Sequence, residues 1–409
     1  MSRENVDVIV VGGGPAGSAT AAHLARAGFS VVVIERAGFP HSKPCGEFFS
    51  PPVRGLLENL GVYEAVTEAG IRAVPDAVLC HERGGTARGT FTGANHRLAP
   101  EGGFSIERRV LDHLLWENAA AAGAETRQGV AVRGLLRGEN GAVGGVRTDS
   151  GEITAKLVIG ADGSRSRVGR ELGLLRPVRR LQKVALVSHF DGVTDVPERA
   201  SVEMFVAGNY VCGWGPGPHG TVNVTLVVPE DRARSVAAQG AEGFVQDTLA
   251  TRFPEVAQRL NGATLRETLT CGTHGHYTTS PVADGALLVG DAAAFIDPFT
   301  GEGVYFALRS AELAAETAVS ALHWGETSAR ALQPYARSRR RELMPKYAVC
   351  EAVERAVHSP DLMRWALPRF RNRPDLLNRI LQVTGDMARP ETLLRPNFWA
   401  AALCTAPAK

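Results

Sequence analysis

A short apolar run near the start of the chain leads directly into a glycine-rich turn and an alanine-rich segment. Val6–Val11 is largely β-branched, which is typical of a strand buried on both faces of a parallel sheet. The residues GGGPAG follow at 12–17, and 18–27 have the composition of a helix that ends before Gly28. Strand, Gly-x-Gly-x-x-Gly and helix in this order predict a Rossmann-type α/β unit that binds a dinucleotide.

The residues of this turn have separate predicted roles. Gly12 permits the tight turn, Gly14 lets a pyrophosphate approach the backbone, and Gly17 lets the helix pack closely on the strand. Pro15 and Ala16 open the helix, whose free N–H groups and positive dipole end would face the phosphates. We therefore expect all five residues at the cofactor.

A second apolar strand ends in a carboxylate at the spacing that such a fold requires. The strand is predicted over Ser30–Ile34, and Glu35 follows it at close to the ~20-residue offset of a ribose-binding acid. Arg36 comes next. We expect Glu35 and Arg36 beside the cofactor ribose.

Two later segments indicate which dinucleotide is bound. Each is a buried strand that ends in a short turn, the first carrying Asp162-Gly163 and the second Gly290-Asp291. They resemble the DG and GD motifs of flavoproteins with the p-hydroxybenzoate hydroxylase fold. The resemblance implies that FAD is the cofactor and that Asp291 bonds its ribityl chain. It also implies that Asp162 and Gly163 lie near the pyrophosphate, on the route by which nicotinamide arrives.

The loop that follows Asp291 narrows the family. Its core, DPFTGEG at 297–303, is similar to the geranylgeranyl reductase family, whose members reduce carbon–carbon double bonds in polyprenyl chains. Pro298 stops the preceding segment, and Gly301 and Gly303, with Glu302 between them, let the backbone approach a flat ring. A helix predicted over 303–322 would direct its positive end there.

Two more segments carry the same resemblance. The loop that holds Cys45 and Gly46 is similar to the family loop beside the isoalloxazine, where Cys45 would touch the flavin or relay a proton. A role for Cys45 as a small packing residue stays open. Arg108 opens a helix at the position where the family has an arginine, which implies contact with the adenosine half of FAD. The alternative for Arg108 is a surface salt bridge.

One segment departs from the family pattern. Polyprenyl reductases have Tyr-x-Trp-x-Phe-Pro along the lipid channel, whereas this chain has Tyr210, Cys212 and Trp214. We expect these three residues to contact substrate, and the cysteine suggests a smaller or more polar one. The following GPGPHG at 215–220 also fits Gly-x-Gly-x-x-Gly, but it precedes an alternating strand and is predicted to be a hairpin turn.

Composition excludes several other classes. The 45 basic residues nearly balance the 43 acidic ones, so no field favours nucleic acid. The six cysteines form no CxxC pair, and His274 and His276 have no recognisable third ligand, so we expect no metal site. No signal peptide and no apolar run of the ~18 residues needed to cross a bilayer is evident. We expect a cytoplasmic protein that binds a small molecule.

These segments predict an interleaved α/β architecture. The FAD-binding domain is predicted over 1–75, 101–175 and 271–335, and an antiparallel-sheet substrate domain over 76–100 and 176–270. Residues 336–409 are predicted to be helical. The single dinucleotide fold implies that NAD(P)H visits as a transient electron donor.

The leading hypothesis is reduction of a carbon–carbon double bond in a mostly apolar substrate, isoprenoid-like or a secondary metabolite. The alternative is a monooxygenase that hydroxylates an aromatic or polyketide-like substrate. A halogenase is less favoured because the Ser-rich loop and the Trp-x-Trp-x-Ile-Pro segment are missing. A flavin-binding protein without turnover is the remaining reading, and the intact flavin motifs oppose it.

Overall fold

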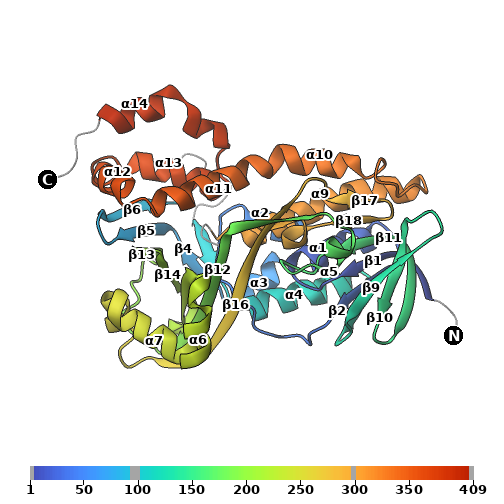
Figure 1. The fold of residues 1–409 in the computed structure, drawn as a ribbon, viewed down its shortest axis with the longest axis horizontal. Helices are drawn as coiled ribbons and strands as arrows, with labels where there is room; N and C mark the ends of the chain where they lie inside the picture. The colour runs from blue at the N-terminus through green and yellow to red at the C-terminus, as the bar shows by residue number, and fades with distance from the viewer. Residues whose placement is uncertain (1–3, 93–101, 296–300, 405–409) are drawn as a thin grey trace.

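The computed structural model describes residues 4–92, 102–295 and 301–404. Pro298 and the rest of 296–300 lie outside these ranges, so its predicted role stays a prediction. The structure has two eight-stranded sheets and one small sheet, with helices between and around them (Figure 1). The N-terminus lies at the end of the first sheet, and the C-terminal helices lie at the opposite end of the molecule.

The first sheet, called here the Rossmann sheet, has the order β17-β18-β11-β1-β2-β8, and β10 and β9 extend it from β11. Strand β1 pairs in parallel with both β2 and β11, as a buried strand between two crossovers should. The strands of the Rossmann sheet are β1 (Glu4–Val11), β2 (Val31–Glu35), β8 (Glu125–Gln128), β9 (Val132–Arg137), β10 (Val143–Thr148), β11 (Gly151–Gly160), β17 (Val282–Ala283) and β18 (Ala286–Leu288).

Side chains that alternate along β1 build two separate cores. Val8 and Val10 pack in the core that contains residues of α1, α4 and α9, whereas Ile9 and Val11 pack in the core that contains residues of the β9–β10 hairpin. The helices of this half are α1 (Pro15–Arg26), α2 (Val53–Asn59), α3 (Tyr63–Glu68), α4 (Arg108–Ala121), α5 (Arg167–Glu171) and α9 (Gly303–His323). The predicted first strand and first helix are therefore present, the helix beginning at Pro15.

The second sheet has the order β19-β16-β12-β15-β14-β13-β5-β6 and is mostly antiparallel. The predicted hairpin at 215–220 joins β14 to β15. The strands of the second sheet are β5 (Asp76–His81), β6 (Gly85–Thr90), β12 (Leu175–Asp191), β13 (Ser201–Ala207), β14 (Tyr210–Pro216), β15 (Val222–Pro229), β16 (Thr264–Thr278) and β19 (Ala294–Phe295). The small sheet consists of β3 (Phe48–Phe49), β4 (Arg72–Val74) and β7 (Gly103–Ser105).

The two faces of the second sheet have different coverings. Its outer face packs on α6 (Ala233–Gln239), α7 (Ala241–Arg252) and α8 (Pro254–Arg259). Its inner face, the one that carries Val211 and Val227, packs at one end on the C-terminal helices (Figure 1). These are α11 (Met344–Val357), α12 (Pro360–Asn372), α13 (Pro374–Thr384) and α14 (Pro396–Cys404), which α10 (Gln333–Glu342) connects to α9.

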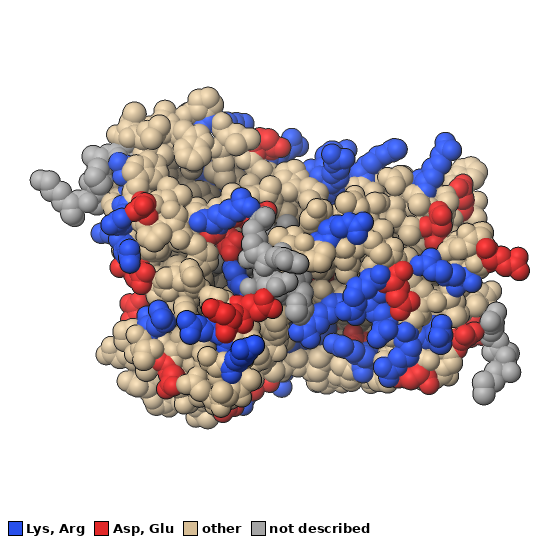
Figure 2. Space-filling model, viewed as in Figure 1, with Lys and Arg blue, Asp and Glu red and all other residues tan. Residues whose placement is uncertain are grey.

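The surface carries both signs of charge. Lys and Arg are interspersed with Asp and Glu over the face that Figure 2 shows, consistent with the near balance of the sequence. Among the described residues, no helix has the length and apolar character that crossing a membrane requires. Within the same ranges, no group of three or more His, Cys, Asp and Glu side chains is placed to hold a metal ion.

Close contact at Gly84 lets the C-terminal helices dock on the β5–β6 turn. A Cβ atom added there would lie 2.8 Å from Leu367 Cδ1 and 2.9 Å from the carbonyl oxygen of Met363 in α12. We predict that Gly84→Val lowers the free energy of unfolding by about 1–3 kcal/mol, because α12 must shift outward. Chemical denaturation measures this change, and limited proteolysis should release the C-terminal helices sooner.

Gly144→Val is the matched control for this prediction. A Cβ atom at Gly144 in β10 would meet no atom within 4 Å, so valine there should be tolerated. Equal unfolding free energies for the two variants would show that the contact at Gly84 contributes nothing to docking.

Candidate active site

In the glycine-rich turn there is space for a side-chain atom at Gly14 but not at Gly12 or Gly17. A Cβ atom on Gly17 would lie 1.8 Å from the Gly12 carbonyl oxygen, and one on Gly12, where φ is +105°, would lie 2.4 Å from the Ala161 oxygen. At Gly14 the nearest atom would be Lys43 Nζ, at 3.4 Å. The backbone of Gly14 is thus accessible beside the N-terminus of α1 and a lysine ammonium, an arrangement that suits a phosphate group.

Glu35 is held at the end of β2 with free acceptor capacity. Its Oε2 accepts a hydrogen bond of 2.8 Å from Gly13 N, and its Oε1 accepts one of 3.1 Å from Ala37 N. Each carboxylate oxygen can accept a second hydrogen bond, which a ribose hydroxyl could donate. Arg36 is exposed at the end of the same strand. The predicted ribose contact of Glu35 therefore suits the geometry.

The DG and GD turns adjoin this glycine-rich turn. Asp162 lies beside Gly12, and its carboxylate accepts hydrogen bonds from Ser166 Oγ, Arg167 N and Val168 N at the start of α5. Gly163 has a φ of +77°, which favours glycine. The Asp162 carboxylate therefore caps α5. If Asp162 lies beside the cofactor, its backbone and not its side chain would face it.

Asp291 has a different environment. It is partly exposed, and burial raises its pKa to about 6, an effect that Arg108, His276 and Lys43 oppose. Gly290, whose φ is +54°, packs so tightly that a Cβ atom would lie 2.8 Å from Ala16 Cβ. The GD turn is therefore fixed against α1, and three basic side chains act electrostatically on its carboxyl group.

A buried ion pair connects α4 to this region. Arg108 Nε and NH2 donate to the two Asp112 oxygens at 2.7 Å each, and Lys43 Nζ lies 3.6 Å from Asp112 Oδ2. The Arg108 side chain is mostly buried and also interacts with Cys45. The alternative of a surface salt bridge for Arg108 is therefore wrong.

The loop that carries Cys45 and Gly46 lies between α4 and the inner face of the second sheet. A Cβ atom on Gly215 would lie 2.9 Å from the Gly46 carbonyl oxygen, so β14 and the loop are in direct contact. Cys45 as a whole residue is partly exposed, but its thiol is buried. Burial raises its pKa, an effect that Arg108 opposes, so the thiol is protonated at neutral pH.

A carboxyl cluster lies where α9 begins. Glu302 precedes α9 and is buried, and its Oε2 accepts a 2.8 Å hydrogen bond from Ser50 Oγ. Burial raises the pKa of Glu302 well above its usual range, and so does the neighbouring Asp386, which is paired with Lys346. Glu302 therefore carries the proton, and Asp386 and Lys346 carry opposite charges.

The Glu302 side chain is thus used for contacts within the protein. It lies between Ser50 and Asp386, and a contact of Glu302 with the cofactor stays a prediction. Gly301 has a φ of +75°, and a Cβ atom there would lie 3.2 Å from Phe48 Cδ1. A Cβ atom on Gly303 would meet no atom within 4 Å. The approach of a flat ring to this turn stays a prediction.

The predicted substrate contacts of β14 need correction. Tyr210, Cys212 and Trp214 are all buried in the outer-face core, where Arg252 lies over the Tyr210 ring and Arg259 over the Trp214 ring. Because side chains alternate along a strand, the residues between them face inward. Tyr210, Cys212 and Trp214 face the outer helices and not the inner face, so Cys212 gives no direct information on substrate size.

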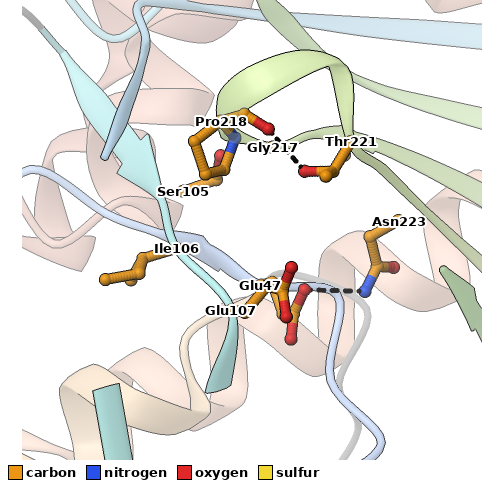
Figure 3. Close-up of a pocket in the computed structure, with 9 residues that line it drawn as sticks. Glu47, Ser105, Ile106, Glu107, Gly217, Pro218, Thr221 and Asn223 are labelled. Carbon is orange, nitrogen blue, oxygen red and sulfur yellow. Dashed lines mark hydrogen bonds between the residues drawn. The ribbon is translucent and has the colours of Figure 1, made fainter. Parts of the chain in front are cut away.

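The sequence analysis missed a polar group on the inner face. It comprises Glu47, which follows the Cys45 loop, and His189, Asn223 and Glu267 on β12, β15 and β16. A small cavity beside Glu47 is also lined by Asn223 and residues of the β14–β15 turn (Figure 3). Glu47 stood next to a recognised motif, but the other three are single polar residues in apolar strands and have no motif.

Comparison with known proteins assigns the family. A family model described as FAD binding domain matches residues 5–349. A digeranylgeranylglycerophospholipid reductase of Methanothermobacter thermautotrophicus is 30% identical over 83% of each chain, and another from Methanopyrus kandleri is 32% identical over 80% of this chain and 81% of its own. A tryptophan 2-halogenase of Chondromyces crocatus is 30% identical over 81% of this chain and 64% of its own.

Solved structures share the fold. A flavoprotein/dehydrogenase from Cytophaga hutchinsonii has a TM-score of 0.83 at 21% identity, covering 98% of each chain. The myxobacterial chondrochloren halogenase CndH has a TM-score of 0.79 at 24% identity, covering 97% of this chain and 93% of its own. With the glycine-rich turn, Glu35 and the GD turn in place, fold and site define an FAD-dependent oxidoreductase. Within that class, the chain belongs to the geranylgeranyl reductase-like family.

The open position at Gly14 gives a test of cofactor binding. We predict that Gly14→Ala leaves the thermal unfolding midpoint of the apoprotein nearly unchanged, because the new methyl group would meet only the movable Lys43 side chain. The affinity for FAD should fall about tenfold or more, since the methyl group occupies the approach of the pyrophosphate. Flavin fluorescence titration measures the dissociation constant.

Gly38→Ala is the control for Gly14→Ala, because a Cβ atom at Gly38 would meet nothing within 4 Å. Unchanged FAD affinity in Gly14→Ala would place the pyrophosphate elsewhere.

The carboxyl cluster gives a second prediction. Because the folded-state pKa of Glu302 is raised, the folded protein holds this proton more tightly than the unfolded chain, and stability is lost as pH rises above the unfolded value. Glu302→Gln should therefore be more stable than the wild type at pH 8 and should show no such gain at pH 4. Urea unfolding at both pH values measures the difference.

Glu316→Gln, on the exposed side of α9, is the matched control and should leave the pH dependence unchanged. A wild-type-like pH dependence in Glu302→Gln would mean that Glu302 is ionised in the folded state.

Proposed function

We propose that the protein uses FAD, reduced by NAD(P)H, to add hydrogen across a carbon–carbon double bond of a mostly apolar, isoprenoid-like substrate. The observation that carries the proposal is the Cys45 thiol, which is protonated and lies where its loop meets the inner face of the second sheet. Olefin reduction requires a proton donor in addition to a hydride, and hydroxylation does not require one at this place. The archaeal relatives that are named as reductases of digeranylgeranyl lipids support the same reaction.

One group of residues would hold the cofactor, and another would orient and protonate the substrate. Gly12, Gly14, Gly17 and Glu35 would hold the adenosine diphosphate half, and Asp291 the ribityl chain. When bound and reduced, FAD supplies the hydride. The protein then orients the olefin, excludes water and delivers a proton from Cys45 Sγ.

The middle of the inner face suits an apolar substrate. Between the polar end of the sheet and the C-terminal helices, the inward positions are Gly213 on β14, Thr225 on β15, Val187 on β12 and Leu269 on β16. These residues are small or apolar, apart from one hydroxyl. We therefore propose that the reacting double bond lies over this row, near Cys45.

The test is an anaerobic incubation of the FAD-loaded protein with NADPH or NADH and an isoprenoid olefin such as geranylgeranyl diphosphate. Mass spectrometry should detect products that have gained hydrogen pairs. Incorporation of isotope-labelled oxygen under air, without anaerobic reduction, would overturn the proposal and favour the monooxygenase.

Substitution of the thiol sharpens this test. We predict that Cys45→Ala slows olefin reduction by about 10²-fold or more, since a positioned general acid typically contributes 10²–10⁴. FAD content and the rate of flavin reduction by NAD(P)H should stay close to those of the wild type. Single-turnover measurement of product separates these steps.

Cys271→Ala, a partly buried cysteine farther along the inner face, is the matched control and should retain activity. If Cys45→Ala formed product as fast as the wild type, Cys45 would not be the proton donor.

A further inference from the structure

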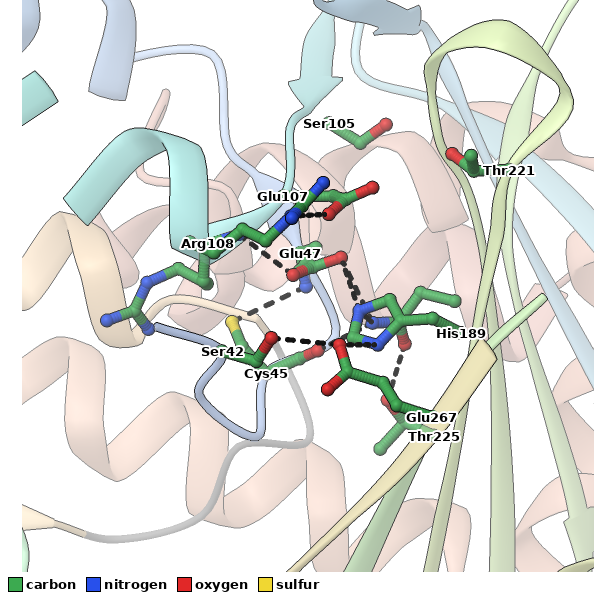
Figure 4. Close-up of polar contacts among 12 residues, drawn as sticks. Ser42, Cys45, Glu47, Ser105, Glu107, Arg108, His189, Thr221, Thr225 and Glu267 are labelled. Atoms are coloured by element: carbon green, nitrogen blue, oxygen red, sulfur yellow. Dashed lines mark hydrogen bonds and ion pairs between the residues drawn. The ribbon is translucent and has the colours of Figure 1, made fainter. Parts of the chain in front are cut away.

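Three neighbouring strands of the second sheet place polar side chains in one row. In the strand register, His189 on β12 lies opposite Asn223 on β15 and opposite Glu267 on β16. His189 and Glu267 lie on the inner face, at the end next to the Cys45 loop (Figure 4), and Asn223 contacts the same loop through the Cys45 carbonyl oxygen. The outward neighbours of His189 and Asn223 include Phe190, Val222 and Val224 of the outer-face core, so the polar row is a local feature of one face.

The row is joined to the Cys45 loop by a continuous set of contacts. Glu267 Oε1 accepts a 2.8 Å hydrogen bond from Ser42 Oγ and lies 3.4 Å from His189 Nδ1. His189 Nε2 lies 3.0 Å from Glu47 Oε2 (Figure 4). The Glu267 side chain is 30% exposed, whereas those of His189 and Glu47 are 4% and 9% exposed. The chain of contacts therefore runs from solvent into the interior.

Glu47 is held in an unusual conformation at the inner end. Its φ is +56°, a region that residues other than glycine occupy at a cost of about 1–2 kcal/mol. This backbone turns the Glu47 N–H toward Cys45 Sγ, at 3.4 Å, while Asn223 Nδ2 donates a 2.8 Å hydrogen bond to the Cys45 carbonyl oxygen. Arg108 N donates to Glu47 Oε1 at 2.8 Å. The surrounding contacts fix both the carboxyl group and the thiol.

The charges around His189 favour its protonated form. Burial lowers the pKa of His189, but Glu47 and Glu267 outweigh this effect and raise the pKa above its ordinary value. Arg266 opposes them, and its guanidinium is itself paired with Glu107 at 2.9 Å and Asp191 at 3.6 Å. Glu47 and Glu267 therefore favour the imidazolium form of His189.

We propose that Glu267, His189 and Glu47 conduct protons from solvent to Cys45. After Cys45 has given its proton to the substrate carbanion, the His189 imidazolium gives its Nε2 proton to the thiolate by way of the Glu47 carboxylate. The neutral imidazole keeps its Nδ1 proton. Once this proton has moved to Nε2 by tautomer exchange, Nδ1 takes a new proton from solvent by way of Glu267. One proton enters for each one that leaves, and no electrons move.

This inference rests on the proposed function, in which Cys45 is the donor. The competing explanation is that His189 only clamps the loop to the sheet. The two explanations differ in pH dependence, because a clamp can be replaced by a neutral hydrogen-bonding side chain and a proton carrier cannot.

The first experiment compares His189→Gln with wild-type holoenzyme in multiple turnover under anaerobic conditions. In the wild type, product formation should fall as pH rises through the pKa of His189, because the imidazolium is the proton carrier. His189→Gln should be about tenfold slower at neutral pH and should lack this limb. His81→Gln, a buried histidine on β5 whose Nδ1 accepts from Arg83 N, is the matched control.

The second experiment needs no turnover. Alkylation of Cys45 by iodoacetamide, followed by peptide mass spectrometry across pH, reports the thiol directly. Loss of the imidazolium leaves Glu47 uncompensated beside the thiol, so alkylation in His189→Gln should be slower and shifted to higher pH. Faster alkylation would show that the loop has been released, which supports the clamp and overturns the relay.

Chemical rescue completes the test. Added imidazole should restore product formation in His189→Ala, with a rate that follows the protonated fraction of the imidazole. Absence of rescue together with an unchanged pH limb in His189→Gln would overturn the relay while leaving the proposed function intact. A wild type that reduces no olefin would instead overturn the proposed function, and the alkylation data would still test the link between His189 and Cys45.

Discussion

The close approach of α1 to β1 at Gly17 is the contact on which the rest of the site depends. Because a Cβ atom at Gly17 would lie 1.8 Å from the Gly12 oxygen, any larger residue would separate the helix from the strand. The same packing sets the N-terminus of α1 beside Glu35 and against the turn of Gly290. Three segments far apart in the sequence are thereby brought to one end of the Rossmann sheet, where open α/β sheets bind their ligands.

Charge burial is the second constraint, and it joins the parts of the molecule to one another. Arg108 and Asp112 are buried together beside the loop of Cys45, and Lys346 pairs with Asp386 where the C-terminal helices meet the α9 turn. Pairs of this kind contribute little net stability, but removing one partner leaves an uncompensated charge and is strongly destabilising. The contact of Lys43 with Asp112 therefore ties the Cys45 loop to α4, and the Lys346–Asp386 pair ties the C-terminal helices to the α9 turn.

The sequence predicted local units well and their relations across the fold poorly. The glycine-rich turn, Glu35 and the helix that begins at Gly303 follow from spacing and composition, which act over a few residues. Whether Tyr210 or Val211 faces inward depends on which face meets the helices, and alternation alone does not decide this. His189 and Glu267 become neighbours only through the pairing of β12 with β16. These two residues are far apart in the sequence, and no local pattern predicts that they pair.

The alternation of β12, β14, β15 and β16 has a consequence for how this protein could change. Side chains that hold the sheet to its outer helices and side chains that face Cys45 occupy different positions along the same strands. Gly213, Thr225 and Leu269 can therefore vary in size or polarity without disturbing the packed core behind them. Under the proposed function, substitutions at these positions would change which substrate is bound while the packed core behind them stays the same, so directed evolution could begin from very small libraries.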